Sequence, residues 1–158
     1  MRVETDVELA TLLSSVKRIA LIGYSDRADR PSHQVFTFLK EAGFEVFPVN
    51  PALVEPAKRE ASVGGEWVWS ALENIPHPID MVDVFRRGSE LPKISRQAIA
   101  LGIPAVWTQL QVRHPTAEAE LVSAGIQLVT DRCPAIEIPR LQSLGLLTQL
   151  SRRSSPNR

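Results

Sequence analysis

Apolar runs that are typical of buried strands alternate with amphipathic segments along most of this chain. Residues 19–22 form a continuous apolar run, as expected for a parallel strand that is covered on both faces. Residues 31–42 instead carry their apolar side chains at helical spacing. Pro31 suits a first helical position because the N–H that proline lacks has no partner there, and Gly43 is suited to end a helix. These two patterns predict a strand followed by a helix.

The remaining elements follow from the same two patterns. Residues 5–8 read Thr-Asp-Val-Glu, a capping box that predicts a helix start. We expect helices at residues 6–16 and 31–42, at about 89–101 with Ser89 as the cap, at 115–124, and as a short helix after Pro134. We expect strands at residues 19–22, 44–49, 67–69, 80–85, 104–108 and 126–129. Residues 51–65 hold two prolines, two glycines and several charges and are predicted to be a surface excursion, and residues 71–75 are predicted to form a single turn.

Strands that alternate with helices through short loops indicate βαβ units. We therefore expect an α/β fold, with a doubly wound, mostly parallel sheet and helices on both of its faces. A length of 158 residues fits one domain, which we place at residues 1–150 with its core at about 16–141. Residues 151–158 are polar and basic and are predicted to be a disordered tail. In such sheets ligands bind beyond the carboxyl ends of the strands, where the winding reverses.

Composition and charge exclude several function classes. Eighteen basic and eighteen acidic residues cancel, so no net field favours nucleic acid or an anionic membrane. No apolar run approaches the roughly 20 residues of a membrane span, and the first residues lack the pattern of a signal peptide. The single cysteine, Cys133, excludes an intrachain disulfide and fits a reducing compartment. We expect a cytoplasmic protein, with a protein partner or homo-oligomer left open.

Candidate binding chemistry gathers where the first predicted strand ends. Gly23 permits a sharp turn and a close approach of backbone to a phosphate. The Ser25 hydroxyl and the backbone amides near Ser32 can donate to a diphosphate, which the dipole of the following helix also favours. Asn50 stands where an NAD-binding protein usually places an acid for the ribose hydroxyls, which indicates a ligand other than NAD. The alternative that Gly23 and Asn50 only form turns stays open.

Polar residues near other predicted strand ends add to this site. Arg86 follows the strand at 80–85, where its guanidinium can bind a phosphate through two parallel hydrogen bonds. Gln109 follows the strand at 104–108 and should face the same cleft. His33 lies in the first turn of the helix that should face phosphate, with an ordinary surface role as the alternative.

The sequence shows no complete motif for a metal site or for a catalytic nucleophile. The three histidines have no metal-ligand spacing, so no metal site is expected. Gly-Tyr-Ser at residues 23–25 resembles part of the esterase elbow, but Arg27 stands where that motif needs its second glycine. Cys133 precedes a helix start, where a thiol pKa can fall, but no partner base is evident and a structural role is favoured. Its reactivity remains an open question, and no catalytic residue is assigned.

Six segments in order give the chain a family resemblance. They read Ile-Gly-Tyr-Ser (22–25), Arg-Pro-Ser-His (30–33), Pro-Val-Asn-Pro (48–51), Ile-Asp-Met-Val-Asp-Val-Phe-Arg (79–86), Ala-Val-Trp-Thr-Gln (105–109) and Asp-Arg-Cys-Pro-Ala-Ile-Glu (131–137). The chain thereby resembles small stand-alone CoA-binding proteins over residues 16–141. Their single domain is similar to the N-terminal CoA-binding Rossmann domain of the succinyl-CoA synthetase α-subunit.

The resemblance implies a Rossmann-like fold, coenzyme A or an acyl-CoA as ligand, and a set of site residues. It implies that the diphosphate region lies against Gly23, Tyr24, Ser25 and Ser32, with Arg30 and His33 from the same segment. The adenosine lies against Asn50 and Pro51. The nucleotide and pantetheine path is lined by Val84, Phe85 and Arg86, with Gln109 near its far end. Two departures are Ala52, where relatives often carry a basic residue, and Gln111, where they usually carry glycine.

The resemblance also implies binding without catalysis by this chain alone. The synthetase needs a phosphorylated histidine in a second domain and a partner subunit, and this chain has neither. Two other functions remain open at this point. One is an NAD(P)-dependent oxidoreductase, which the missing acid and the missing third glycine disfavour. The other is a regulatory or scaffold protein with a vestigial nucleotide pocket, which predicts no measurable CoA affinity.

Overall fold

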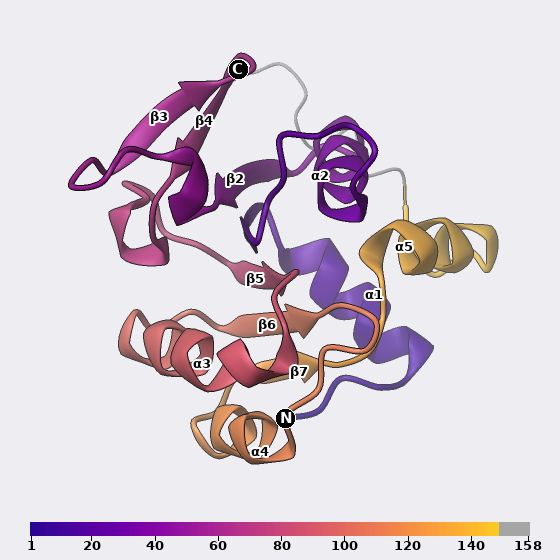
Figure 1. The fold of residues 1–158 in the computed structure, drawn as a ribbon. Coiled ribbons are helices and arrows are strands. Elements are labelled where there is room, and N and C mark those ends of the chain that lie inside the picture. Colours follow the sequence, from indigo (N-terminus) through magenta and orange to yellow (C-terminus); the bar gives the residue numbers. More distant parts are fainter. Residues whose placement is uncertain (149–158) are drawn as a thin grey trace.

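Seven strands form one sheet in the computed structural model, which describes residues 1–148 (Figure 1). The strands are β1 (Arg18–Ile22), β2 (Glu45–Val49), β3 (Glu60–Val63), β4 (Glu66–Trp69), β5 (Met81–Val84), β6 (Ala105–Thr108) and β7 (Gln127–Val129). Their order across the sheet is β3-β4-β2-β1-β5-β6-β7. Only β3 and β4 pair in the antiparallel direction, and every other pair is parallel. The chain winds outward from β1 in both directions, as expected for a doubly wound sheet.

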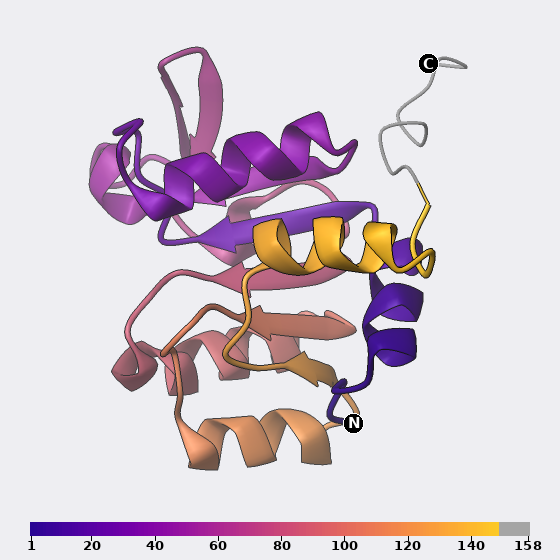
Figure 2. The same ribbon diagram turned by 90° about the vertical axis from the view of Figure 1, so that its right-hand side faces the viewer.

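Five α-helices cover the two faces of this sheet. They are α1 (Asp6–Ser15), α2 (Pro31–Glu41), α3 (Leu91–Ala100), α4 (Pro115–Ser123) and α5 (Pro134–Ser143), with short 3-10 turns η1 (Pro51–Leu53), η2 (Leu72–Asn74) and η3 (Gly88–Glu90). Helices α1, α2 and α5 pack on one face, and α3 and α4 pack on the other, as the turned view shows (Figure 2). The predicted Rossmann-like, single-domain α/β fold is confirmed.

Alternation along the central strands divides the core into two layers. In β1, Ile19 and Leu21 face α1, α2 and α5, whereas Ala20 and Ile22 face α3 and α4. Strand side chains point to opposite faces at successive positions, so a strand that is covered on both sides must be apolar throughout. This is why residues 19–22 read as an unbroken apolar run.

The first helix and the fourth helix begin as their sequences indicate. Thr5 and Glu8 form both hydrogen bonds of the capping box at the start of α1. His114 caps α4, since its Nδ1 accepts a hydrogen bond from the backbone amide of Ala117 at 3.1 Å. Ser89 does not cap α3. It lies inside the η3 turn, and α3 begins at Leu91 with Glu90 at the cap position and no side-chain cap bond. The prediction for Ser89 was therefore wrong.

The predicted surface excursion at residues 51–65 is partly wrong. Residues 60–63 form β3, which pairs with β4 through a hairpin whose turn is Gly64-Gly65. The strand alternates exposed positions with Ala61 and Val63, which pack against the core, as is typical of an edge strand with one covered face. The sheet therefore has seven strands rather than the six expected from the sequence. The predicted disordered tail at residues 151–158 lies outside the described residues.

None of the helices among residues 1–148 is long and apolar enough to cross a membrane.

Candidate functional site

The strand ends at β1 and β5 lie at the point where the winding of the sheet reverses. After β1 the chain passes to β2 on one side, and β5 lies on the other side. The two strand ends stay joined, because the Phe85 amide donates to the Ile22 carbonyl at 2.8 Å. Ligands of doubly wound folds bind beyond the carboxyl ends of the strands at such a point.

Gly23 makes the turn that leaves β1. Its φ of +91° is a left-handed backbone conformation that residues with a side chain rarely adopt. A Cβ at this position would lie 2.7 Å from the Phe85 carbonyl oxygen and 2.9 Å from Cδ of Arg86. Its backbone amide donates to the Val49 carbonyl at 2.9 Å. Glycine is therefore needed here for the turn and for close packing against the end of β5, and its amide is already occupied.

The loop after Gly23 is tied to the first turn of α2. The Ser25 amide donates to the Ser32 hydroxyl at 3.0 Å, and the Ser25 hydroxyl accepts from the Arg27 amide at 3.2 Å. Nδ1 of His33 lies 3.0 Å from the Ser25 carbonyl oxygen. The same Nδ1 lies 3.4 Å from the Tyr24 hydroxyl, and which of the two contacts is a hydrogen bond depends on the tautomer of the ring. These bonds fix the loop beside the helix start.

The first turn of α2 keeps two donors available. No described residue accepts a hydrogen bond from the backbone amides of Ser32 and His33, whereas the Gln34 amide already donates to the Arg30 carbonyl. The first amides of a helix have no partner within it, and together with the helix dipole they attract an anion. Ser32 and His33 are thus the groups best placed to bind phosphate.

Tyr24 and Asn50 fix the loop through packing and hydrogen bonds. The Tyr24 ring is buried and packs edge-on against Phe36 with ring centres 4.9 Å apart. Asn50 uses both ends of its amide: Nδ2 donates to the Tyr24 carbonyl at 2.7 Å, and Oδ1 accepts from the Ala52 amide at 2.9 Å. The asparagine therefore fixes the turn after β2, and no carboxylate stands at this position.

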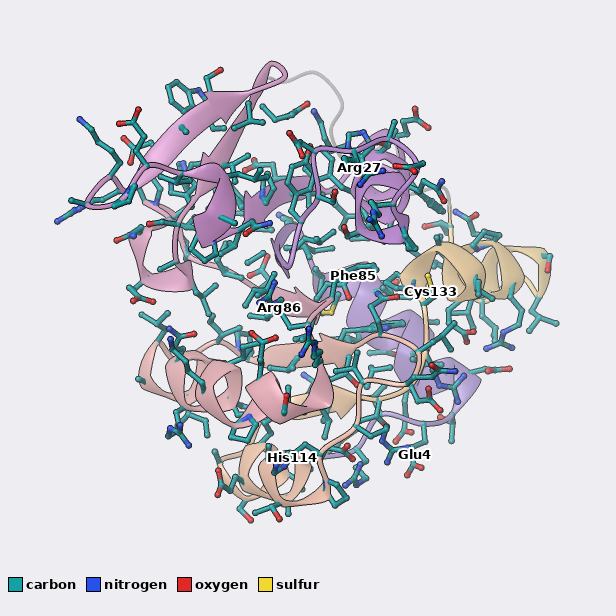
Figure 3. All side chains as sticks on the ribbon, in the orientation of Figure 1. Glu4, Arg27, Phe85, Arg86, His114 and Cys133 are labelled. Carbon is teal, nitrogen blue, oxygen red and sulfur yellow. The ribbon has the colours of Figure 1, made fainter. Side chains whose placement is uncertain are left out.

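The two candidate arginines come from different segments, the start of α2 and the end of β5. Arg30 is the exposed cap residue of α2 and makes no side-chain cap bond. Arg86 follows β5 and donates from Nε and Nη2 to one oxygen of Glu90, at 3.0 and 2.9 Å. Figure 3 shows Phe85 and Arg86 together beyond β5, whereas His114 lies apart, at the start of α4. The pair with Glu90 offsets the charge of Arg86, although its Nη1 keeps donors that no described residue accepts.

A cleft of about 430 Å³ opens beside this loop. It lies between the carboxyl ends of β1 and β2, the η2 turn and the first two turns of α3. Gly23, Pro51 and Arg86 are the lining residues that were expected at the site. The cleft is also lined by Ser70, Leu72, Lys93 and Gln97, which the sequence does not assign to the site because it predicts only a turn and a core helix for their segments. Lys93 and Gln97 could have been found as polar residues on the exposed side of α3, whereas Ser70 and Leu72 carry no such signal.

A buried polar pair lies on the other face of the sheet, at the end of β5 and β6. Gln109 does not line the cleft that it was expected to face, because its side chain is 6% exposed and its Nε2 donates to Oδ1 of Asp83 at 2.7 Å. Asp83 is fully buried, and its Oδ2 has no hydrogen-bond partner among the described residues. Burial raises the pKa of Asp83 to about 7, and the bond from Gln109 offsets part of that rise. Val84, the next residue, is fully buried among the side chains facing α3 and α4.

Sequence reasoning passed over Asp83, although a lone carboxylate inside the apolar run at 79–85 was the available signal. Cys133 occupies the N-cap position of α5 without a side-chain cap bond and is half-buried. Burial raises the pKa of the Cys133 thiol, which disfavours the thiolate that reacts with electrophiles. No group of three or more metal-ligating side chains occurs in the part of the chain that the structure describes.

The mostly parallel, doubly wound sheet defines a Rossmann-like protein. At the sheet edge where its winding reverses, the first amides of α2 can bind an anion. The chain belongs to the family described as CoA binding domain, which it matches over residues 17–139. This match confirms the resemblance to CoA-binding proteins that the sequence motifs indicated.

Individual relatives agree with this assignment. The chain is 35% identical over 133 residues to the uncharacterized protein YneT of Bacillus subtilis (strain 168), covering 84% of this chain and 93% of the relative. A solved structure from Thermus thermophilus is 38% identical, with a TM-score of 0.78, and covers 87% of this chain and 99% of that one. A hypothetical protein from Pyrococcus horikoshii OT3 is 32% identical, with a TM-score of 0.79 over 88% and 93% of the two chains.

Proposed function

We propose that this protein binds coenzyme A or an acyl-CoA non-covalently, without catalysing a reaction by itself. The observation that carries the proposal is the pair of unpartnered amides of Ser32 and His33 at the start of α2. They suit a diphosphate, which the helix dipole also favours. Membership in a family of CoA-binding domains supports CoA as the ligand that brings this diphosphate.

The arrangement around these amides gives each part of the ligand a place. Gly23 belongs both to the loop beside α2 and to the lining of the cleft, so a ligand can run from one to the other across this residue. The adenosine half enters the cleft, whose apolar walls include Ile22 and Val49. The pantetheine half runs past Phe85 towards Gln109. A pocket that is mostly apolar, with a few placed polar groups, is typical of cofactor sites.

The absence of catalysis is part of the proposal. A hydrolase would need a nucleophile in contact with a base. Ser25 lies in the loop of the proposed site, but His33 contacts its backbone carbonyl rather than its hydroxyl. The raised pKa of Cys133 disfavours a thiolate nucleophile there. We further propose a cytoplasmic location, where CoA is available and a lone cysteine stays reduced.

Calorimetry with CoA, acetyl-CoA and NAD tests the ligand class. We expect saturable binding of CoA or acetyl-CoA and none of NAD, because no carboxylate faces the ribose hydroxyls at Asn50. Binding of NAD without CoA would overturn the proposal in favour of an oxidoreductase. No binding of any of the three at millimolar concentration would favour a scaffold with a vestigial pocket.

A matched pair of variants tests where the diphosphate lies. Ser25→Asp places a carboxylate beside the start of α2, and Ser25→Asn has nearly the same shape without the charge. Two unit charges about 4 Å apart near a protein surface repel by about 4 kcal/mol, so Ser25→Asp should weaken CoA binding by about 100-fold or more. Ser25→Asn should bind nearly as well as the wild type. Equal loss in both variants would contradict this placement.

A further inference from the structure

The cleft beside Gly23 has apolar walls and a charged rim. Leu72 and Ile94 are buried side chains that line it from the η2 turn and from α3. Its rim carries four charged residues, two of each sign: Arg86, Lys93, Glu73 and Glu90. How these charges pair determines which of them is available to a ligand.

Three of the four charged groups already have partners. Arg86 donates to Glu90 at 2.9 Å, and Glu73 accepts a hydrogen bond from Nε2 of Gln97 at 3.3 Å. Lys93 is exposed on the first turn of α3 and forms no ion pair with any residue from 1 to 148. The opposite wall of the cleft, at Pro51, brings no charge. Lys93 is thus the rim cation whose charge no ion pair within residues 1–148 offsets.

We infer that Lys93 binds the phosphate monoester on the ribose of CoA, and that it thereby makes the cleft selective for CoA over dephospho-CoA. This inference rests on the proposed function, since it assumes that the diphosphate lies at α2 and the adenosine in the cleft. The ribose phosphate is attached to that adenosine half, so it enters the cleft with it. An ammonium group is a compact charge that suits a phosphate without a fixed orientation.

The strength of this contact follows from its exposure. Water and salt screen an exposed ammonium, so its bond to a dianionic phosphate should be worth about tenfold in affinity. Glu73 lines the same cleft and opposes the phosphate by like-charge repulsion. Removing its charge should therefore strengthen CoA binding by about threefold.

Calorimetry with CoA and dephospho-CoA on four proteins tests the inference. The wild type should bind CoA about tenfold more tightly than dephospho-CoA. Lys93→Gln should remove that preference by weakening CoA alone, and Lys93→Arg should restore it. Glu73→Gln should enlarge it. Dephospho-CoA lacks the ribose phosphate, so its affinity should change little in all variants.

The outcomes separate this inference from the proposed function. If the wild type binds both ligands equally, or if Lys93→Gln keeps the preference, the role of Lys93 is overturned while CoA binding at α2 stands. If the wild type binds neither ligand, both proposals fail. Retention of the charge-dependent preference in Lys93→Arg supports the role of the charge rather than of the side-chain shape.

Discussion

Replacing Asp83 by asparagine should remove a marked pH dependence from the stability of the fold. The carboxyl group is fully buried in β5, and only Oδ1 has a partner, Gln109 at 2.7 Å. Burial disfavours the charged form, which raises the pKa of Asp83 from its ordinary value of 3.8 to about 7. The proton therefore binds more tightly in the folded state than in the unfolded state.

The sign and size of the effect follow from that difference in pKa. Below pH 3.8 the carboxyl group is protonated in both states, and its contribution to stability is fully present. As the pH rises towards about 7, the unfolded state loses the proton while the folded state keeps it. The free energy of unfolding should fall by about 1.4 kcal/mol per pH unit in this range, on the order of 4 kcal/mol in all. Asparagine has no charge to gain or lose.

Urea unfolding from pH 4 to 8 measures this effect, because wild type and Asp83→Asn share every other titrating group. The variant should gain stability relative to the wild type as the pH rises, and the difference should level off above about pH 7. Gln109→Leu removes the hydrogen bond that lowers the pKa of Asp83, so it should move that levelling point upward. Parallel curves for wild type and Asp83→Asn would refute the reasoning.

Three further changes test the packing and charges of the molecule. Gly23→Ala should lower the free energy of unfolding by about 2 to 4 kcal/mol, because its Cβ would meet the Phe85 carbonyl at 2.7 Å in a left-handed turn; unchanged chemical denaturation would contradict this. Glu90→Gln should strengthen CoA binding about threefold in calorimetry by releasing Arg86, and weaker binding would argue against a role for that arginine. The ion pairs and backbone bond to buried Glu118 lower its pKa to about 2, so stability should fall as the pH drops from 4.5 towards 2; Glu118→Gln should flatten this loss, and an unchanged acid transition would contradict it.

The central elements could be predicted because burial on both faces leaves a strong local pattern. Residues 19–22 had to be apolar to pack between two helical layers, and Pro31 and Gly43 mark the two ends of the next helix. The pattern fails at the sheet edge. Strand β3 has one covered face and polar residues between Ala61 and Val63, so its sequence looks like that of a loop. Only the pairing with β4 makes it a strand.

The candidate site was predictable in position but not in its internal bonds. Gly23, Phe85 and Arg86 do meet at the point where the winding reverses. The sequence does not indicate that the Asn50 side chain both donates to the Tyr24 carbonyl and accepts from the Ala52 amide, because these bonds depend on the path of the backbone around it. Lys93 belongs to the cleft only because α3 packs beside the η2 turn, a contact between distant segments.

The most direct test of the account follows the backbone amides of Ser32 and His33 by NMR while CoA is added. A phosphate that accepts hydrogen bonds from these amides should shift both proton signals downfield, and the shifts should saturate at the same CoA concentration as the calorimetric signal. If CoA binds and the two signals stay in place, the ligand lies elsewhere and the proposed site is wrong.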